Sequence, residues 1–346
     1  MSKLVIAVSG INAVDNPGPG VGVARGLKAD AGLDAEIVGL AYDAMDPGVY
    51  MDWVIDRSYL MPYPSGGGEA FIDRLFEIQA DRGLDVVIPN LDAELPIYIR
   101  YREELASRGI RVLLPTMSQF RLRAKDHLVQ AAPSFGCLTP PTEVLTGPGQ
   151  LDAALARIGY PAMIKGCLYE AWRADTQAEA YHHADHLVAA WGWPLLVQGI
   201  VTGEHMNVVG LGDGTGGLLG LVGLKKLGIT KLGKIWTGVT VDHAGMLEAT
   251  ERFIAHSRWQ GPFELECIVD GDRIYLIEIN PRFPAWVNCS TGVGINLPAR
   301  LVRHLLELPN DTSTAYPAGK LFIRYTDDLV ADMAQFSSLV MTGAAS

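Results

Sequence analysis

The chain has 346 residues, of which 49% are apolar, with a mean hydropathy of +0.16 and a formal net charge of −11. These values predict a globular protein with a substantial core, and the negative charge disfavours a nucleic-acid partner, because backbone phosphates are bound by clustered Lys and Arg. The apolar start MSKLVIAVSG lacks a basic leader and no apolar run approaches the roughly 18 residues of a membrane span, so we expect a cytoplasmic protein with no membrane partner.

Residues 1–115 alternate strands with helices. Strands are predicted at 4–8, 35–40, 85–89 and 111–114, and helices at 18–29, behind a glycine-rich turn, at 71–82 and at 96–108. This alternation is typical of a parallel sheet covered by helices on both faces, so a Rossmann-like lobe is expected. Asp92 and Glu94 follow the third strand, where such sheets present ligands, although they could also be charges at a helix start.

From Thr116 the pattern changes. A basic helical stretch at 119–132 precedes a Pro-rich connector at 138–149, a helix at 151–158, a strand at 161–166 and a helix at 176–190. Strands then dominate up to residue 280, with a helix at 246–257 among them and another at 298–306 after them, and 336–346 reads as a frayed tail. We therefore divide the chain into 1–115, 116–192, a small lobe with its linker, 193–310, a large lobe, and 311–346, a C-terminal extension.

The segment FELECIVDGDRIYLIEINPR predicts a hairpin that turns at Asp270-Gly271. Residues two apart on a strand share a face, so Glu278 and Asn280 project together, with Glu266 across from them, while Ile277 and Ile279 anchor the other side. Two carboxylates and an amide oxygen on one face are typical of a Mg²⁺ site. The alternative is that both glutamates are solvated positions of an edge hairpin.

Several lysines stand where phosphate ligands would be useful. Lys125 lies in the basic helical stretch, and Lys165 ends an apolar strand, where an unpaired ammonium is costly. Either could instead be a surface lysine, and the lysines of GLKKLGITKLGKIW (223–236) could belong to a solvated hairpin or attract substrate phosphate.

The order of these features resembles the ATP-grasp superfamily. Lys125 is followed by PAMIKG with Lys165, then LLVQGIVTGEHMNVV (195–209), then FELE with IEINPR, and the last hairpin looks like that of the carbamoyl phosphate synthetase large subunit and of carboxylate–amine ligases. The similarity spans about residues 116–308, behind the Rossmann-like lobe that precedes ATP-grasp domains. It implies an α/β ATP-grasp fold and a Mg-ATP-dependent ligase that phosphorylates a carboxylate and lets an amine displace phosphate.

The resemblance also assigns roles by position. Lys125 and Lys165 would contact the ATP phosphates, and Arg282 would stabilise the transferring phosphoryl group. The adenine edge would be held by the backbone of Gln198, Gly199 and Ile200, and the ribose by Glu204, or by His205 in a gap-free match. The metal, Mg²⁺ with Mn²⁺ as an alternative, would be held by Glu266, Glu278 and Asn280.

One stretch departs from the family pattern. Many relatives follow the second lysine with a glycine-rich loop over the phosphates, but here the sequence is KGCLYEAWRADT, with Gly166 as its glycine. Either Tyr169 to Arg173 form a different lid, with Arg173 supplying a phosphate contact, or closure is weak.

Two other functions stay open at this stage. A nicotinamide-dependent oxidoreductase would use residues 1–115 but leaves the acidic hairpin unexplained, and a non-catalytic nucleotide-binding protein would need no Arg282. For a ligase, the resemblance implies a small-molecule carboxylate and an amine, an amino acid or peptide among them, and suggests a homodimer. The sequence identifies neither substrate.

Overall fold

A five-stranded sheet forms the N-terminal lobe of the computed structural model, which describes residues 3–14, 17–167, 170–231, 233–311 and 313–345. Its strands run in the order β15 (Ala344–Ala345), β3 (Arg57–Leu60), β2 (Ala35–Ala41), β1 (Leu4–Ser9) and β4 (Val86–Ile88). The strands β1 to β4 pair in parallel, and β15 is antiparallel to β3. The predicted parallel sheet is confirmed.

Two cores cover opposite faces of this sheet. Alternate residues of β1 divide between them: Ile6 and Val8 pack with α1 (Gly20–Ala29), and Val5 and Ala7 pack with α2 (Gly68–Arg82). On the α2 side also lie α3 (Leu95–Arg100) and α4 (Arg102–Ser107), which replace the single helix predicted over 96–108. The strand predicted at 111–114 is wrong, because Arg111 forms one isolated bridge to Val86, and β3 was not predicted.

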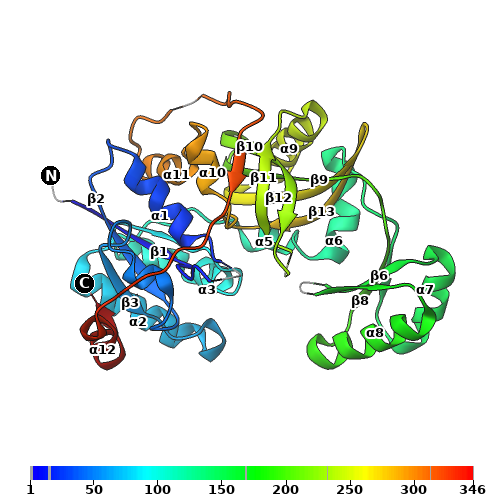
Figure 1. Ribbon diagram of the computed structural model, residues 1–346, viewed down its shortest axis with the longest axis horizontal. Coiled ribbons are helices and arrows are strands. Elements are labelled where there is room, and N and C mark those ends of the chain that lie inside the picture. Colours follow the sequence, from blue (N-terminus) through cyan, green and yellow to red (C-terminus); the bar gives the residue numbers. More distant parts are fainter. Residues whose placement is uncertain (1–2, 15–16, 168–169, 232, 312, 346) are drawn as a thin grey trace.

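A second, smaller lobe stands apart at the other end of the molecule (Figure 1). Its antiparallel sheet has the order β5 (Thr142–Leu145), β8 (Leu195–Gly199), β6 (Ala162–Gly166) and β7 (Ala171–Ala174). The helices α7 (Leu151–Ile158) and α8 (Gln177–Trp191) pack on it. β5 lies within the segment 138–149 that we expected to be a connector. β8 belongs to this sheet although it follows residue 192, where we ended the small lobe. Our division of the chain stays a proposal.

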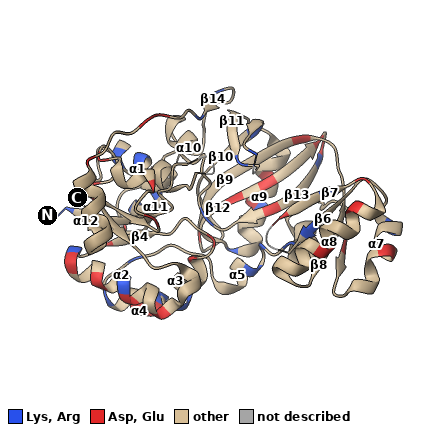
Figure 2. Cartoon of the chain, turned by 60° about the horizontal axis from the view of Figure 1, so that its bottom comes forward, with Lys and Arg blue, Asp and Glu red and all other residues tan. Residues whose placement is uncertain are grey.

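The third sheet is antiparallel and joins the two lobes (Figure 1). Its order is β13 (Arg273–Asn280), β12 (Gln260–Asp270), β9 (Glu204–Asp213), β10 (Leu218–Ile229), β11 (Ile235–Thr240) and β14 (Leu321–Ile323). The helices near it are α5 (Met117–Arg121), α6 (Lys125–Ala131), α9 (Ala244–Ser257), α10 (Asn288–Gly292) and α11 (Leu297–Leu305). Trp259, Phe263 and Phe253 fill its core. Acidic residues lie on its strands (Figure 2).

The C-terminal segment is folded, so the predicted frayed tail is wrong. Residues 320–336 return from the third sheet to the N-terminal lobe, where α12 (Met333–Thr342) and β15 follow (Figure 1). Ala344 pairs with Tyr59 on the edge of the parallel sheet, and Leu339 is fully buried. The short turns η1 (Pro47–Tyr50), η2 (Pro64–Gly66), η3 (Ala132–Phe135) and η4 (Pro148–Gln150) complete the description. No helix of the described chain is long and apolar enough to span a membrane.

Candidate active site

The β12–β13 hairpin brings acidic side chains together as the sequence predicts. Glu266 is paired directly with Glu278, and Glu264 with Asn280, so these side chains share one face. A bulge falls between Glu266 and Cys267, opposite Ile277, which is therefore half-buried and does not anchor the far face as expected. Ile279 does lie in the core, 1% exposed.

Glu264 is the residue of this hairpin that the sequence analysis missed. It is 4% exposed, and its carboxylate accepts hydrogen bonds from Asn207 Nδ2 at 2.6 Å, Trp286 Nε1 at 2.7 Å and Asn280 Nδ2 at 3.0 Å. Burial raises the pKa of Glu264, and the neighbouring Glu266 raises it further. Because Glu264 holds the amide nitrogen of Asn280, the amide oxygen faces the other way. The FELE repeat, with two glutamates on one face, was the available signal.

Lysines neutralise the other two carboxylates. Lys226 Nζ lies 2.6 Å from Glu266 Oε2, and Lys125 Nζ lies 3.4 Å from Glu278 Oε1. Burial favours the neutral form of Glu266, but Lys226, Arg282 and the Asn280 amide together outweigh it, so the pKa of Glu266 falls below its usual value. For Glu278 burial prevails over Lys125 and raises the pKa. Lys226 belongs to the lysine-rich segment 223–236, for which the sequence allowed either a solvated hairpin or a role in attracting substrate phosphate.

Arg282 connects the hairpin to the N-terminal lobe. Its Nε donates to Asp92 Oδ1 at 3.0 Å and its Nη2 to Asn280 Oδ1 at 3.1 Å. Asp92 follows β4 and also accepts from Arg123 Nη1 at 2.7 Å. Burial alone would lower the pKa of Arg282, but Asp92 and the hairpin glutamates raise it, so the guanidinium remains charged. Asp92 thus lies at the strand end where the sequence predicts ligand contacts.

Lys165 faces the hairpin from the small lobe. Its Nζ donates to Gln198 Oε1 at 2.6 Å, and Gln198 Nε2 donates to Thr142 Oγ1 at 2.8 Å, so adjacent strands of the small sheet fix the lysine. Lys165 and Gln198 are each 7% exposed. Burial, and then the charge of Lys125, lower the pKa of Lys165 to about 8. Lys125 touches the same lobe, because its N–H donates to the Cys167 carbonyl at 3.2 Å.

The remaining predicted residues lie around this cluster. Gly199 and the 39%-exposed Ile200 continue from Gln198 toward β9. Glu204 is exposed and ion-paired with Lys225, and His205 follows it with a pKa lowered by burial and by Lys226.

The expected lid between the second lysine and α8 is described only in part. Leu168 and Tyr169 lie outside the described residues, and Ala171–Ala174 forms β7. Arg173 is exposed, and its Nη2 is 2.6 Å from Asp175 Oδ1. Its contacts among the described residues are therefore local to the small lobe, and the structure does not join it to the hairpin cluster.

The metal-ligand prediction concerns two carboxylates and one amide. Within the described part of the chain, no three His, Cys, Asp or Glu side chains are grouped so as to hold a metal ion. The Glu264 carboxylate already accepts hydrogen bonds from three N–H donors, so we do not count it among the metal ligands. The opposed Glu266 and Glu278 and the Asn280 amide are hard oxygen donors, which fit Mg²⁺ when substrate and water complete the shell.

No protein-family model matches the chain. A formate-dependent phosphoribosylglycinamide formyltransferase of Mycolicibacterium smegmatis is 25% identical over 274 residues, which are 71% of this chain and 66% of that protein. The chain thus spans just under two thirds of this curated relative.

Solved structures agree along most of the chain. The N5-carboxyaminoimidazole ribonucleotide synthetase of Thermus thermophilus superposes with a TM-score of 0.65 at 17% identity, covering 90% of this chain and 81% of that one. The biotin carboxylase of Campylobacter jejuni, in complex with a β,γ-ATP ligand, superposes with a TM-score of 0.67 at 17% identity, covering 89% of this chain and 72% of that one. The chain has the ATP-grasp fold. The ATP-grasp resemblance drawn from the two lysines and IEINPR is confirmed at the level of the fold.

Proposed function

We propose that the chain is a Mg-ATP-dependent ligase that activates a carboxylate as an acyl phosphate and transfers the acyl group to an amine. One observation carries the proposal: Glu266, Glu278 and Asn280 meet Arg282 on one hairpin face, with Lys125 reaching Glu278 from the small-lobe side. Simple nucleotide binding does not require the partly buried Arg282, whereas phosphoryl transfer requires positive charge around the moving group.

Each residue then has a task. Lys125 and Lys165 bind the ATP phosphates, and Gln198, Gly199 and Ile200 hold the adenine edge. Glu204 or His205 binds the ribose hydroxyls. Arg173 would have to break its ion pair with Asp175 to contact a phosphate. Glu266, Glu278 and Asn280 would hold Mg²⁺ or Mn²⁺, which would neutralise phosphate charge. The Campylobacter jejuni biotin carboxylase named above was solved with a β,γ-ATP ligand, which supports this assignment.

The proposed reaction has two steps. A carboxylate oxygen of the substrate attacks the γ-phosphorus, the bond to the β-phosphate oxygen breaks, and ADP leaves. An amine then attacks the acyl carbon, inorganic phosphate leaves with the carbon–oxygen bond electrons, and the amine loses a proton to solvent. Arg282, oriented by Asp92, supplies charge to the phosphoryl group in the first step and to the departing phosphate in the second.

A thioester route is disfavoured by the cysteines near the cluster. Cys267 and Cys289 are buried, and burial raises the pKa of both thiols, that of Cys289 to about 11, whereas a nucleophilic cysteine needs its thiolate.

A nicotinamide-dependent function finds little support in the glycine-rich turn. Cβ atoms at Gly18 and Gly20 would lie 2.2 Å from the Gly10 carbonyl and 2.3 Å from the Ser9 carbonyl oxygens. These glycines therefore let α1 approach β1, which explains them without a dinucleotide. Asp15 and Asn16 of this turn lie outside the described residues.

Small-molecule substrates are the class that the relatives' names support. An amide or peptide product, and a homodimer, remain part of the proposal.

ADP release tests the proposal. With ATP, Mg²⁺ and panels of carboxylic acids and amines, the wild type should release ADP, and Glu278→Gln and Asn280→Ala should not while keeping the wild-type melting temperature. A matched control is Glu248→Gln, an exposed helix glutamate paired with Arg252, which should behave as wild type. Wild-type ADP release by Glu278→Gln would reject the site.

A further inference from the structure

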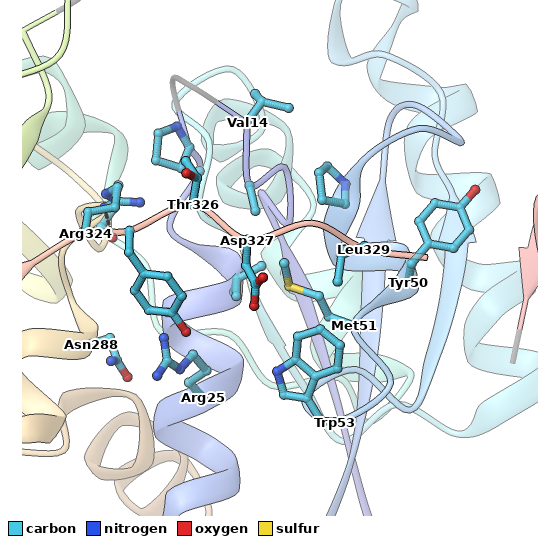
Figure 3. Close-up of a pocket in the computed structure, with 18 of the residues that line it drawn as sticks. Val14, Arg25, Tyr50, Met51, Trp53, Asn288, Arg324, Thr326, Asp327 and Leu329 are labelled. Atoms are coloured by element: carbon cyan, nitrogen blue, oxygen red, sulfur yellow. Dashed lines mark hydrogen bonds between the residues drawn. The ribbon is translucent and has the colours of Figure 1, made fainter. Parts of the chain in front are cut away.

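A cavity of about 1010 Å³ lies beneath residues 320–336, called the strap from here on. Its other walls are α1, the loop 45–53 and α10 (Figure 3). The volume is at the upper end of the range for small-molecule sites. The lysine and hairpin residues described above are not part of its lining, so it is a second space beside the proposed ATP site.

Large apolar side chains line the middle of this cavity from both sides. Met51 and Trp53 extend from the loop, opposite Leu329 of the strap (Figure 3). Trp53 is 59% exposed, and Met45, which also lines the cavity, is 68% exposed. Exposed aromatic and Met side chains that gather in a concave site mark a surface that gains free energy when an apolar group covers it.

One end of the cavity is basic and adjoins the proposed reaction centre. Arg324 lines this end, and its Nη2 donates to the Ala285 carbonyl at 2.8 Å. Ala285 follows Arg282 by three residues in the chain. The buried Nε of Arg324 finds no hydrogen-bond partner among the described residues. Lys234 Nζ donates to the Pro17 carbonyl at 2.8 Å, and its pKa falls to about 8 through burial and the nearby Arg282 and Arg324. Lys234 itself is not part of the lining, so Arg324 is the cation that this end of the cavity presents.

The lining as a whole carries no net charge. Arg25, Lys320 and Arg324 are balanced by Asp327, Asp328 and Asp332 of the strap. Asp327 lies over the middle of the cavity, near the apolar groups (Figure 3). A second negative charge on a ligand would meet these carboxylates, so the cavity suits a single anionic group at the Arg324 end.

We propose that this cavity holds the carboxylate substrate of the ligase and selects a monocarboxylic acid with a bulky apolar body. This inference rests on the proposed function. The carboxylate lies toward Arg324, at the end of the cavity nearest Arg282 and the phosphoryl group, and the apolar body lies against Trp53 and Met51. A phosphoribosyl compound, such as the one in the name of the mycobacterial relative, does not fit a middle covered by Asp327.

Binding without turnover tests the inference. Calorimetry of the full chain, without ATP, compares acetate, butanoate, octanoate, 3-phenylpropanoate and phosphoribosylglycinamide. Burial of each methylene improves binding about fourfold, so the Kd of octanoate should be on the order of 100-fold below that of butanoate. Trp53→Ala should weaken octanoate at least about tenfold and leave acetate unchanged. Trp191→Ala removes a similarly exposed tryptophan, 53%, from the far lobe and should change neither.

The charge contribution is tested separately. Arg324→Gln should weaken the binding of every acid by a similar factor. Arg324→Lys keeps the positive charge and should restore most of the binding, which covers the case in which glutamine unfolds the strap. Equal binding of butanoate and octanoate, no effect of Trp53→Ala, or tighter binding of phosphoribosylglycinamide than of the acids would each overturn the inference.

ADP release separates this inference from the proposed function. Release that rises with the length of the acid in the same order as the affinities supports both. Release with short acids and no gain from an apolar body overturns the cavity assignment and leaves the ligase intact. Absence of release with every acid and amine, despite graded binding, contradicts the ligase and with it the role of the bound acid as substrate.

Discussion

Replacing Lys165 by methionine should stabilise the fold while it weakens ATP binding. The buried ammonium has a pKa of about 8 in place of 10.5, chiefly because burial disfavours its charged form. At pH 7 the folded chain must still protonate this group, and 2.5 units at about 1.36 kcal/mol each make the penalty roughly 3.4 kcal/mol. Methionine removes the charge but leaves Gln198 Oε1 without its donor, which costs about 1 kcal/mol. The net gain at pH 7 is then about 2 kcal/mol.

The effect of this substitution should depend on pH in a defined direction. Between pH 8 and 10.5 the unfolded chain binds the lysine proton and the folded chain does not, so wild-type stability rises with pH across this window relative to the variant. At pH 10 the penalty falls to roughly 0.8 kcal/mol, and the advantage of Lys165→Met should be about zero.

Urea unfolding at pH 7 and pH 10 measures both values, with nucleotide affinity determined in parallel. The exposed Lys231→Met is the control and should change stability little at either pH. A variant that is less stable than wild type at pH 7, or a stability difference that does not change with pH, would refute the assignment of Lys165 as a ligand group buried at a cost to the fold.

Three further changes have expected outcomes. Glu264→Gln places an amide N–H against the N–H groups of Asn207, Asn280 and Trp286 that now donate to the carboxylate, so turnover should fall by about 100-fold. The exposed Glu248→Gln is the control and should not change turnover. Wild-type turnover by Glu264→Gln would show that Glu264 is not a positioning residue. Arg282→Lys should lower turnover by about 100-fold or more in steady-state assays, because an ammonium cannot reproduce the planar fork, and full activity would make the arginine structural. Leu339→Ala should cost about 3 kcal/mol in urea unfolding and the 57%-exposed Val340→Ala under about 0.5, and equal losses would indicate that α12 does not pack as described.

The hairpin and its acidic face could be predicted because both follow from local rules. The turn falls at Gly271 and Asp272, one residue later than predicted, because Asp270 still pairs with Arg273; the two-residue period then assigns Glu266, Glu278 and Asn280 to one face. The bulge at Ile277 could not be predicted, because it depends on how the strand meets its partner. Glu264 was missed because its role comes from Trp286 and other donors that only the fold brings to it.

Long-range contacts explain the other differences. Asp92 and Arg282 lie 190 positions apart in the chain, and nothing in either segment indicates their ion pair. The C-terminal residues form α12 and β15 because Leu339 and Ala344 find the edge of the N-terminal sheet, whereas their own composition is that of a tail. The cavity beneath the strap likewise exists only because residues 320–336 cross between lobes.

The most direct test of the acyl phosphate mechanism follows the oxygen atoms of the substrate. The wild-type chain is incubated with ATP, Mg²⁺, an amine and a carboxylic acid labelled with ¹⁸O in its carboxyl group, and the phosphorus-containing products are analysed by mass spectrometry. The proposal predicts ADP together with inorganic phosphate that carries one ¹⁸O per turnover. Formation of AMP, with ¹⁸O in its phosphate, would instead show adenylation and contradict the assignment of Arg282 and the hairpin to γ-phosphoryl transfer.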